Sequence, residues 1–378
     1  MSRELLGIGA LAVLCIALVP FMNRYLESEK SRILIPEKTN KPILFVDETV
    51  PTNRPKTIIM IRNSFPPITY AGSELSDYEA MMYLQKRGHT IYLFLGKYVV
   101  PEYKGLKLYK LDFSDPFCLS VLSNADAIFI SEVMPSHKDN IYKYLEQKQS
   151  PVFMNIHVAN QFGWLLQQKT PMPLIIIFNS KMTLENEHTI HKHFVMYPYV
   201  DIAPFKRLRK YTIRNSTVTL INCNRNKGGD MLVSLAKKMP NTNFVGVKGG
   251  YGQQITDTTL PNLRYIETTA DIASVLRQTG ILIMPSNSET WGRTAVEAMA
   301  AGVPVIHSES QGLIECMEGA GMMCVHDDEN AWGEAIEKIN GDPAFREQLR
   351  QRGFKRVEEV DTLQKYGRQT LAYVIESL

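Results

Sequence analysis

The chain of 378 residues is longer than one hydrophobic core normally supports, so we expect two folded domains. Its composition, 44% hydrophobic and 21% charged, is that of a folded protein. A net charge of +3, with no basic run interleaved with aromatic residues, argues against a nucleic-acid partner. Five scattered cysteines without a CxxC pair or metal-ligand spacing argue against zinc and favour buried, free thiols.

The first 56 residues divide into an apolar stretch and a charged linker that contains several prolines. Residues 5–22 carry no charge, and 18 residues at about 1.5 Å each cover about 27 Å, enough to cross a bilayer core. A removable signal peptide is the alternative, but the stretch is longer than usual and no A-x-A site follows it. We therefore expect a membrane anchor in residues 1–22 and a linker in residues 23–56.

Basic residues near the apolar stretch bear on its orientation. Only Arg3 precedes the stretch, whereas five lysines and arginines follow it up to Lys41. This imbalance favours a single-pass membrane protein whose globular part faces the cytosol.

From residue 57 the chain repeats a strand, a loop, a helix and a second strand. The first such unit has apolar, β-branched runs at 57–62 and 90–95 around a helical pattern, and the second has runs at 217–222 and 243–247. Further strand-like runs follow in both halves, at 126–131, 151–158, 173–179, 281–286 and 303–308. Nearly continuous apolar strands suit parallel sheets that are buried on both faces.

These patterns predict two doubly wound α/β domains that face each other across a cleft. We expect the boundary near residues 200–212, which gives an N-terminal domain over 57–205 and a C-terminal domain over 206–378. In such folds, sites lie beyond the carboxyl ends of the strands. The loops of interest are therefore 63–74, 157–164, 223–230, 248–252, 285–292 and 307–315.

Two glycine-rich loops have the composition of phosphate-binding segments. "NKGGD" (226–230) opens a predicted helix, where glycines let backbone N–H groups approach an anion and Lys227 adds a positive charge. "KGGYG" (248–252) follows the next strand. Taken alone, each loop is also compatible with a plain turn.

The segment from Ile281 to Gly302 carries a stronger pattern. A strand leads into a loop that contains Glu289, and a helix then runs from Gly292 to about Ala301. Glu297 lies within this helix among alanines that permit close packing. A carboxylate directed at vicinal hydroxyls is the usual way in which nucleotide sites hold a ribose.

The spacing of Glu289 and Glu297 within this segment resembles the E-x(7)-E signature of family 4 retaining glycosyltransferases, and the resemblance extends over residues 57–378. It implies the GT-B fold, in which two Rossmann-like domains enclose a nucleotide-sugar. It also implies a hexosyltransferase-type retaining enzyme with a UDP- or GDP-sugar donor and a glycan, glycoprotein or lipid-linked acceptor. No metal or other cofactor is expected, since no D-x-D motif is suitably placed.

The same resemblance assigns roles to individual residues. Glu297 would hold the ribose, Glu289 the transferred sugar, and Lys227 with Gly228 the diphosphate. The implied site also includes Gly72 near donor and acceptor, His157 beside the donor sugar, the amides around Trp291, Gly292 and Arg293, and Glu315 of a G-G-x-x-E-like segment in which Gln311 replaces the first glycine. We therefore expect His157 and Glu289 to be catalytic and the others to bind the donor.

The chain departs from the family at one point. The usual G-R-x before the phosphate loop reads Asn222-Cys223-Asn224, and whether Arg225 takes the place of the missing arginine is open. A non-catalytic nucleotide-sugar-binding membrane protein and a GT-B-like epimerase are the alternative functions. Donor binding without turnover would identify the former, and product analysis the latter.

Overall fold

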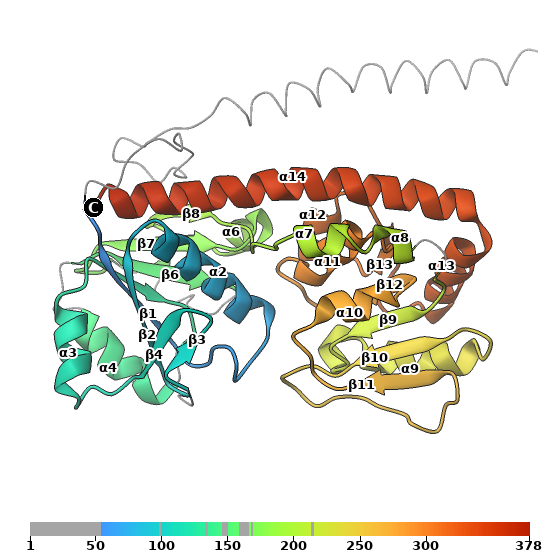
Figure 1. Cartoon of the computed structure of the whole chain (residues 1–378), viewed down its shortest axis with the longest axis horizontal. Coiled ribbons are helices and arrows are strands. Elements are labelled where there is room, and N and C mark those ends of the chain that lie inside the picture. The colour runs from blue at the N-terminus through green and yellow to red at the C-terminus, as the bar shows by residue number, and fades with distance from the viewer. Residues whose placement is uncertain are drawn as a thin grey trace, which may run out of the picture.

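The computed structural model describes residues 54–97, 100–132, 135–145, 150–158, 166–167, 169–212 and 215–378. The expected membrane anchor and nearly all of the expected linker lie outside the described residues. Within them, no helix is both long and apolar enough to cross a membrane. They form two α/β domains side by side, with one long helix extending along both (Figure 1).

The first domain is built on an eight-stranded sheet in the order β3-β4-β2-β1-β5-β6-β7-β8. All neighbours are parallel except β3 and β4. The strands are β1 (Thr57–Arg62), β2 (Thr90–Leu95), β3 (Glu102–Tyr103), β4 (Leu106–Lys110), β5 (Ala127–Ile130), β6 (Val152–Ile156), β7 (Leu174–Phe178) and β8 (Lys192–Val195). The strand order reverses between β1 and β5, which makes that position the topological switch point of this sheet.

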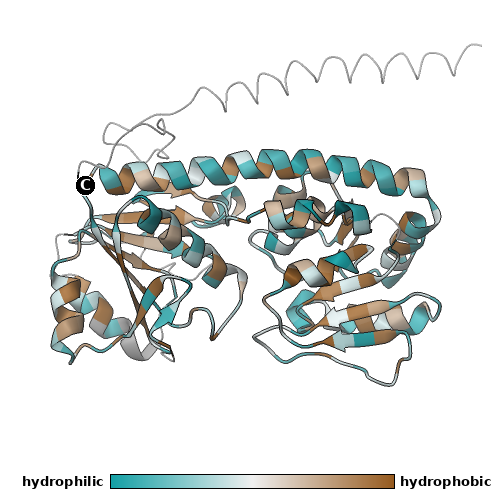
Figure 2. Cartoon of the chain, in the orientation of Figure 1, coloured by the Kyte–Doolittle hydropathy of each residue, from teal (hydrophilic) through white to brown (hydrophobic). Residues whose placement is uncertain are grey.

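Helices cover both faces of this sheet. Apolar residues of α3 and α4 belong to the cluster on one face, and Ala80, Met81 and Leu84 of α2 belong to the cluster on the other. The helices of this domain are α2 (Gly72–Lys86), α3 (Pro116–Ser123), α4 (Pro135–Leu145) and α6 (Lys181–Asn186). Figure 2 shows the central strands as mostly hydrophobic, and β6 and β7 are buried at every residue, as expected for strands that are covered on both faces.

The second domain has a six-stranded parallel sheet in the order β11-β10-β9-β12-β13-β14. Its strands are β9 (Val218–Ile221), β10 (Phe244–Val247), β11 (Leu263–Ile266), β12 (Ile281–Met284), β13 (Val305–His307) and β14 (Met322–Met323). The order reverses between β9 and β12. The switch point therefore lies between the two loops that the sequence marks most strongly.

The helices of the second domain also lie on both faces of its sheet. One cluster contains residues of α10, α11 and α12, and the other contains residues of α9 and α13. These elements are α7 (Ala203–Lys206), α8 (Arg209–Thr212), the 3₁₀ turn η1 (Arg225–Lys227), α9 (Gly229–Lys238), α10 (Ile272–Arg277), α11 (Arg293–Ala301), α12 (Gln311–Met317) and α13 (Glu329–Gly341).

The C-terminal helix α14 (Pro343–Glu376) joins the two domains. Val357 and Val360 pack in the second domain, whereas Leu371 and Ile375 pack in the first. At Gly367 a Cβ would lie 2.9 Å from the Cα of Met196, so a larger residue would not fit there. The helix holds the two sheets in a defined relative position.

Candidate functional site

The switch point of the second sheet brings the loop after β9 next to the loop after β12. Gly228 has a φ of +92°, and a Cβ there would lie 2.3 Å from Cγ of Pro285. A side chain is therefore excluded both by backbone conformation and by space. This glycine lets the predicted phosphate loop pack directly against the segment that carries Glu289.

Lys227 is positioned by the turn that precedes it. Its backbone N–H donates to the side-chain oxygen of Asn224 at 2.9 Å, which caps η1. The departure from the family pattern at residues 222–224 thus supplies a capping residue for the turn that presents this lysine.

Lys227 and Glu289 form an ion pair, with 2.6 Å between Nζ and Oε1. The two side chains are 17% and 16% exposed, and the hydroxyl of Ser286 donates to the same carboxylate oxygen at 3.1 Å. Burial alone would lower the pKa of Lys227, but the nearby Glu289 carboxylate and Tyr251 raise it above its usual value. The lysine is therefore charged at neutral pH.

Arg225 lies outside this cluster. Its guanidinium is 78% exposed, and its Nε is 3.4 Å from Oδ2 of Asp230. In the described part of the chain, no three His, Cys, Asp or Glu side chains are grouped so as to hold a metal ion.

Helix α11 begins at Arg293 and ends at Ala301, as the sequence predicts, with Gly302 as its left-handed C-cap. Gly292 is the N-cap, and no side chain caps the helix. Glu297 is 5% exposed on this helix, and its Oε1 is 3.1 Å from Nε of Arg293. Burial raises the pKa of Glu297, although Arg293 partly opposes this effect.

The side chains of Arg293 and Trp291 face the interdomain segment, residues 196–202. Arg293 donates to the backbone carbonyl of Tyr199, and the ring of Trp291 packs on Tyr197 with centroids 4.5 Å apart. The resemblance assigns backbone amides to donor binding here. The two side chains anchor this end of α11 to the interdomain segment, and the role of the amides stays a prediction.

Glu315 also takes part in a contact between the domains. Its carboxylate accepts backbone N–H groups of Lys181 and Met182, at 3.0 and 2.8 Å, and the hydroxyl of Tyr197 at 2.7 Å. Nearby, a Cβ at Gly312 would lie 2.2 Å from the carbonyl oxygen of Glu289, which explains the glycine. The donor-binding role expected for Glu315 stays a prediction.

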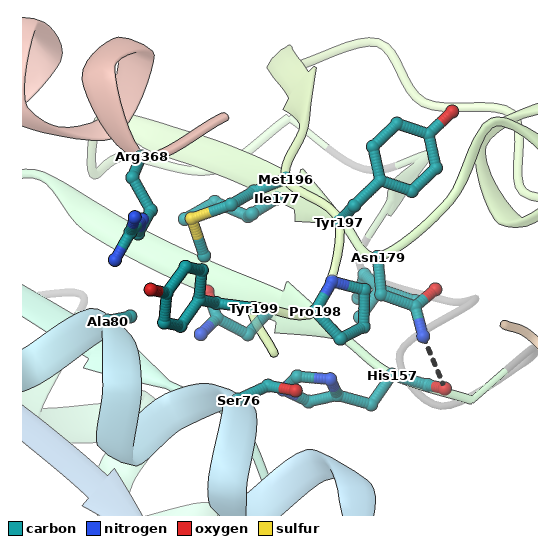
Figure 3. A pocket seen from close by; sticks show the side chains of 12 residues that line it. Ser76, Ala80, His157, Ile177, Asn179, Met196, Tyr197, Pro198, Tyr199 and Arg368 are labelled. Carbon is teal, nitrogen blue, oxygen red and sulfur yellow. Dashed lines mark hydrogen bonds between the residues drawn. The ribbon is translucent and has the colours of Figure 1, made fainter. Parts of the chain in front are cut away.

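His157 follows β6 and contacts both domains. Its carbonyl oxygen accepts the hydroxyl of Thr290 at 2.7 Å and the side-chain amide of Asn179 at 3.1 Å. Figure 3 shows His157 and Asn179 beside a cavity of about 10 Å³, room for about one water molecule. The cavity also reaches Arg368 of α14. Because Thr290 follows Glu289 directly, this contact places His157 close to the Glu289 loop.

Gly72, the other site residue expected in the first domain, is the exposed first residue of α2. A Cβ there would meet no atom within 4 Å. Open space therefore lies in front of this loop.

A buried network behind His157 was not anticipated from the sequence. Asp77 of α2 and Arg62 at the end of β1 form an ion pair, and Oδ1 of Asp77 is 3.0 Å from Nε2 of His157. Asn155 donates to the same oxygen at 2.7 Å. The available signal was an arginine at the end of an otherwise apolar strand, followed by a helix that carries an aspartate.

Comparison with known proteins finds a family match in the second domain. Residues 206–356 match the profile described as "Glycosyl transferases group 1". The match covers less than half of the chain. The matched segment contains the Lys227 loop, Glu289 and Glu297, so it carries most of the candidate site.

Curated relatives match over short segments. The capsular polysaccharide biosynthesis glycosyltransferase CapM of Staphylococcus aureus is 30% identical over 120 residues, 31% of this chain and 30% of its own length. A D-inositol 3-phosphate glycosyltransferase of Pseudarthrobacter chlorophenolicus is 33% identical over 81 residues, 21% of this chain and 19% of its own length. The matched segments thus span about a third or less of these relatives.

Solved structures match over most of the chain and show the fold. Anabaena HepE in complex with UDP-glucose superposes with a TM-score of 0.66 at 16% identity, covering 84% of this chain and 100% of that one. A glycosyltransferase from Rickettsia africae gives 0.63 at 15% identity, covering 85% and 98%. These likenesses concern the fold alone, which is of the GT-B type.

Proposed function

We propose that the protein transfers a hexose from a nucleotide-diphosphate-sugar, such as a UDP- or GDP-sugar, to a hydroxyl acceptor with retention of anomeric configuration. The observation that carries the proposal is the arrangement at the second switch point. One cation, Lys227, and one partly exposed carboxylate, Glu289, lie beside a helix start without a side-chain cap and a buried carboxylate on that helix. In this proposal Lys227 and the helix start bind the diphosphate, Glu289 binds the transferred sugar, and Glu297 binds the ribose.

Lys227 and the first-turn amides of α11 would bind the diphosphate and stabilise the charge that develops when the sugar leaves. Glu297 would accept hydrogen bonds from the ribose hydroxyls, and Glu289 from hydroxyls of the transferred sugar. The bond from the anomeric carbon to the diphosphate breaks while the acceptor oxygen bonds to the same face of that carbon. The departing phosphate oxygen takes the acceptor proton.

The acceptor would bind against the first domain, near Gly72 and His157. We further propose a glycan, glycoprotein or lipid-linked acceptor. The uncharged residues 5–22 support attachment to a membrane, and the basic residues that follow them support a cytosolic orientation of the globular part. The polysaccharide pathway in the name of CapM agrees with such an acceptor.

The test uses the full chain in detergent micelles with a panel of UDP- and GDP-sugars and lipid-linked or oligosaccharide acceptors. We expect acceptor-dependent nucleotide release with one donor, and a product with the same anomeric configuration as the donor by NMR. Donor binding without release across the panel would contradict the proposal. Release accompanied by an inverted product would contradict only the retaining mechanism.

A further inference from the structure

The buried carboxylate of Asp77 connects His157 to the core of the first domain. Asp77 is 0% exposed, and every contact described for its two oxygens comes from a polar side chain. One oxygen contacts His157 at 3.0 Å and Asn155 at 2.7 Å, and the other pairs with the buried guanidinium of Arg62. The carboxylate is thus held from several directions, and His157 is one of its contacts.

The charge state of Asp77 decides which hydrogen bond it makes. Burial alone would raise the pKa of Asp77, but His157 and Arg62 outweigh burial and hold it well below its usual value. An ionised carboxylate can only accept hydrogen bonds. The hydrogen at this contact therefore lies on Nε2 of His157. In the neutral imidazole, Nδ1 then carries no hydrogen and can accept a hydrogen bond.

We propose that Asp77 is a positioning residue for the transfer reaction, because it fixes the ring orientation and the Nε2–H tautomer of His157. The inference rests on the proposed function, in which His157 lies beside the transferred sugar. Besides Asp77, the charged or titratable side chains around this site are Arg62 behind the carboxylate, Arg368 of α14, and Tyr197 and Tyr199 of the interdomain segment.

The backbone of His157 is fixed independently. Its carbonyl accepts the hydroxyl of Thr290 from the Glu289 loop, whereas its ring is held by α2. The two contacts together leave little freedom in either the position or the rotation of the imidazole. A substitution at Asp77 should therefore alter the ring without displacing the loop that carries Glu289.

The chain offers a matched control. Glu74 of α2 is also buried, at 4% exposed, and pairs with the same Arg62 guanidinium at 3.2 Å. Glu74→Gln removes a carboxylate from Arg62 but leaves the Asp77–His157 contact in place. In Asp77→Asn, Arg62 keeps Glu74, so the variant retains one buried partner for the guanidinium.

The experiment measures transfer kinetics and ¹⁵N spectra of the full chain labelled at its eight histidines, with His157→Gln to assign the signal. We expect Asp77→Asn to lower kcat roughly 100-fold with a donor KM within about threefold, and to shift the tautomer, because an amide can donate to Nε2. Glu74→Gln should keep kcat within about twofold and retain the wild-type signal. Asp77→Asn combined with His157→Gln should be no slower than His157→Gln alone.

Two outcomes would overturn the inference. One is an equal fall in kcat for Asp77→Asn and Glu74→Gln, which would give Asp77 a structural role only. The other is a wild-type His157 that carries its hydrogen on Nδ1. If the wild-type protein transfers no sugar at all, the proposed function fails, while the tautomer of His157 in the wild type and in Asp77→Asn still supports or overturns the positioning contact.

Discussion

The two domains use charged residues differently at their switch points. In the first domain, Arg62 and Asp77 are almost completely buried, and each is paired with another charged or polar group of the same domain. In the second domain, Lys227 and Glu289 are partly exposed and paired with each other. The charged groups are paired in both domains, but only the Lys227–Glu289 pair can exchange one partner for a charged group of a ligand.

This difference follows from the cost of desolvating a charge. A fully buried ion pair loses several kcal/mol when one partner is removed, so it is suited to fixing a geometry. A pair that remains open to solvent on one side can exchange one partner for a ligand group, because water and the ligand can reach its charges as they separate. In the proposed function the second domain would present its charges to the donor, whereas the first domain uses its charges to hold His157.

The largest effect is expected at Glu297, because no other carboxylate of the proposed site could take over its contact to the ribose. Glu297→Gln should lower the kcat/KM for the donor roughly 1,000-fold, because hydrogen bonds that two ribose hydroxyls donate to a charged carboxylate contribute about 1.5–3 kcal/mol each. Steady-state nucleotide release measures the change. The exposed Glu337→Gln on α13 is the control, and equal activity of the two variants would exclude Glu297 from the donor site.

Lys227 and Arg225 provide the next test, because they lie two residues apart with different exposure. Lys227→Met should raise the donor Kd roughly 50-fold through loss of a charge-assisted contact to phosphate. Arg225→Met should change the Kd less than about threefold, because its side chain is exposed and paired with Asp230. Isothermal titration with the donor measures both. A larger effect at Arg225 would show that it moves into the site when the donor binds.

A smaller effect of opposite sign is expected at Glu289. In the free protein Lys227 must leave this carboxylate before it binds a diphosphate, so Glu289→Gln should tighten binding of the free nucleotide diphosphate roughly fivefold. The same substitution should lower kcat, because the contact to the sugar is lost. Weaker binding of the nucleotide alone would contradict the assignment of Glu289 to the sugar rather than to the phosphate.

Much of the fold could be predicted from the sequence because apolar runs and glycine stops are local signals. The strand expected at 57–62 is β1, the one expected at 90–95 is β2, and the helix expected to end at Ala301 does so. The hairpin of β3 and β4 and the edge strand β8 were missed. β3 has only two residues, and β4 and β8 mix charged or polar residues with apolar ones, so none of them forms a continuous apolar run. Their pairing depends on the neighbouring strands.

The site was less predictable, because its polar contacts join distant parts of the chain. The sequence identified Lys227, Glu289 and Glu297 through one loop and one helix. It gave no sign that Glu315 accepts amides of α6, about 130 residues earlier, or that Asp77 contacts His157. Such pairings depend on how the sheets and α14 place the two domains, which no local pattern encodes.

The smallest effect concerns stability, where Glu297 and Asp77 should act in opposite directions with pH. The pKa of Glu297 is raised on folding, so the folded state disfavours its charge and loses stability as pH rises from the unfolded pKa near 4.5 through the folded value. Glu297→Gln should therefore raise the free energy of unfolding at pH 7, by about 1 kcal/mol. The gain should shrink as pH falls toward 4.5.

Asp77 has a lowered pKa, so its contribution is present above pH of about 4 and is lost as pH falls through its folded value. The loss of stability in Asp77→Asn should accordingly diminish on acidification. Denaturant unfolding of both variants between a pH of about 2 and about 8 measures the two slopes. Parallel curves would mean that Glu297 is ionised at no cost in the free protein, and that a contact other than Arg293 stabilises its charge before any ribose binds.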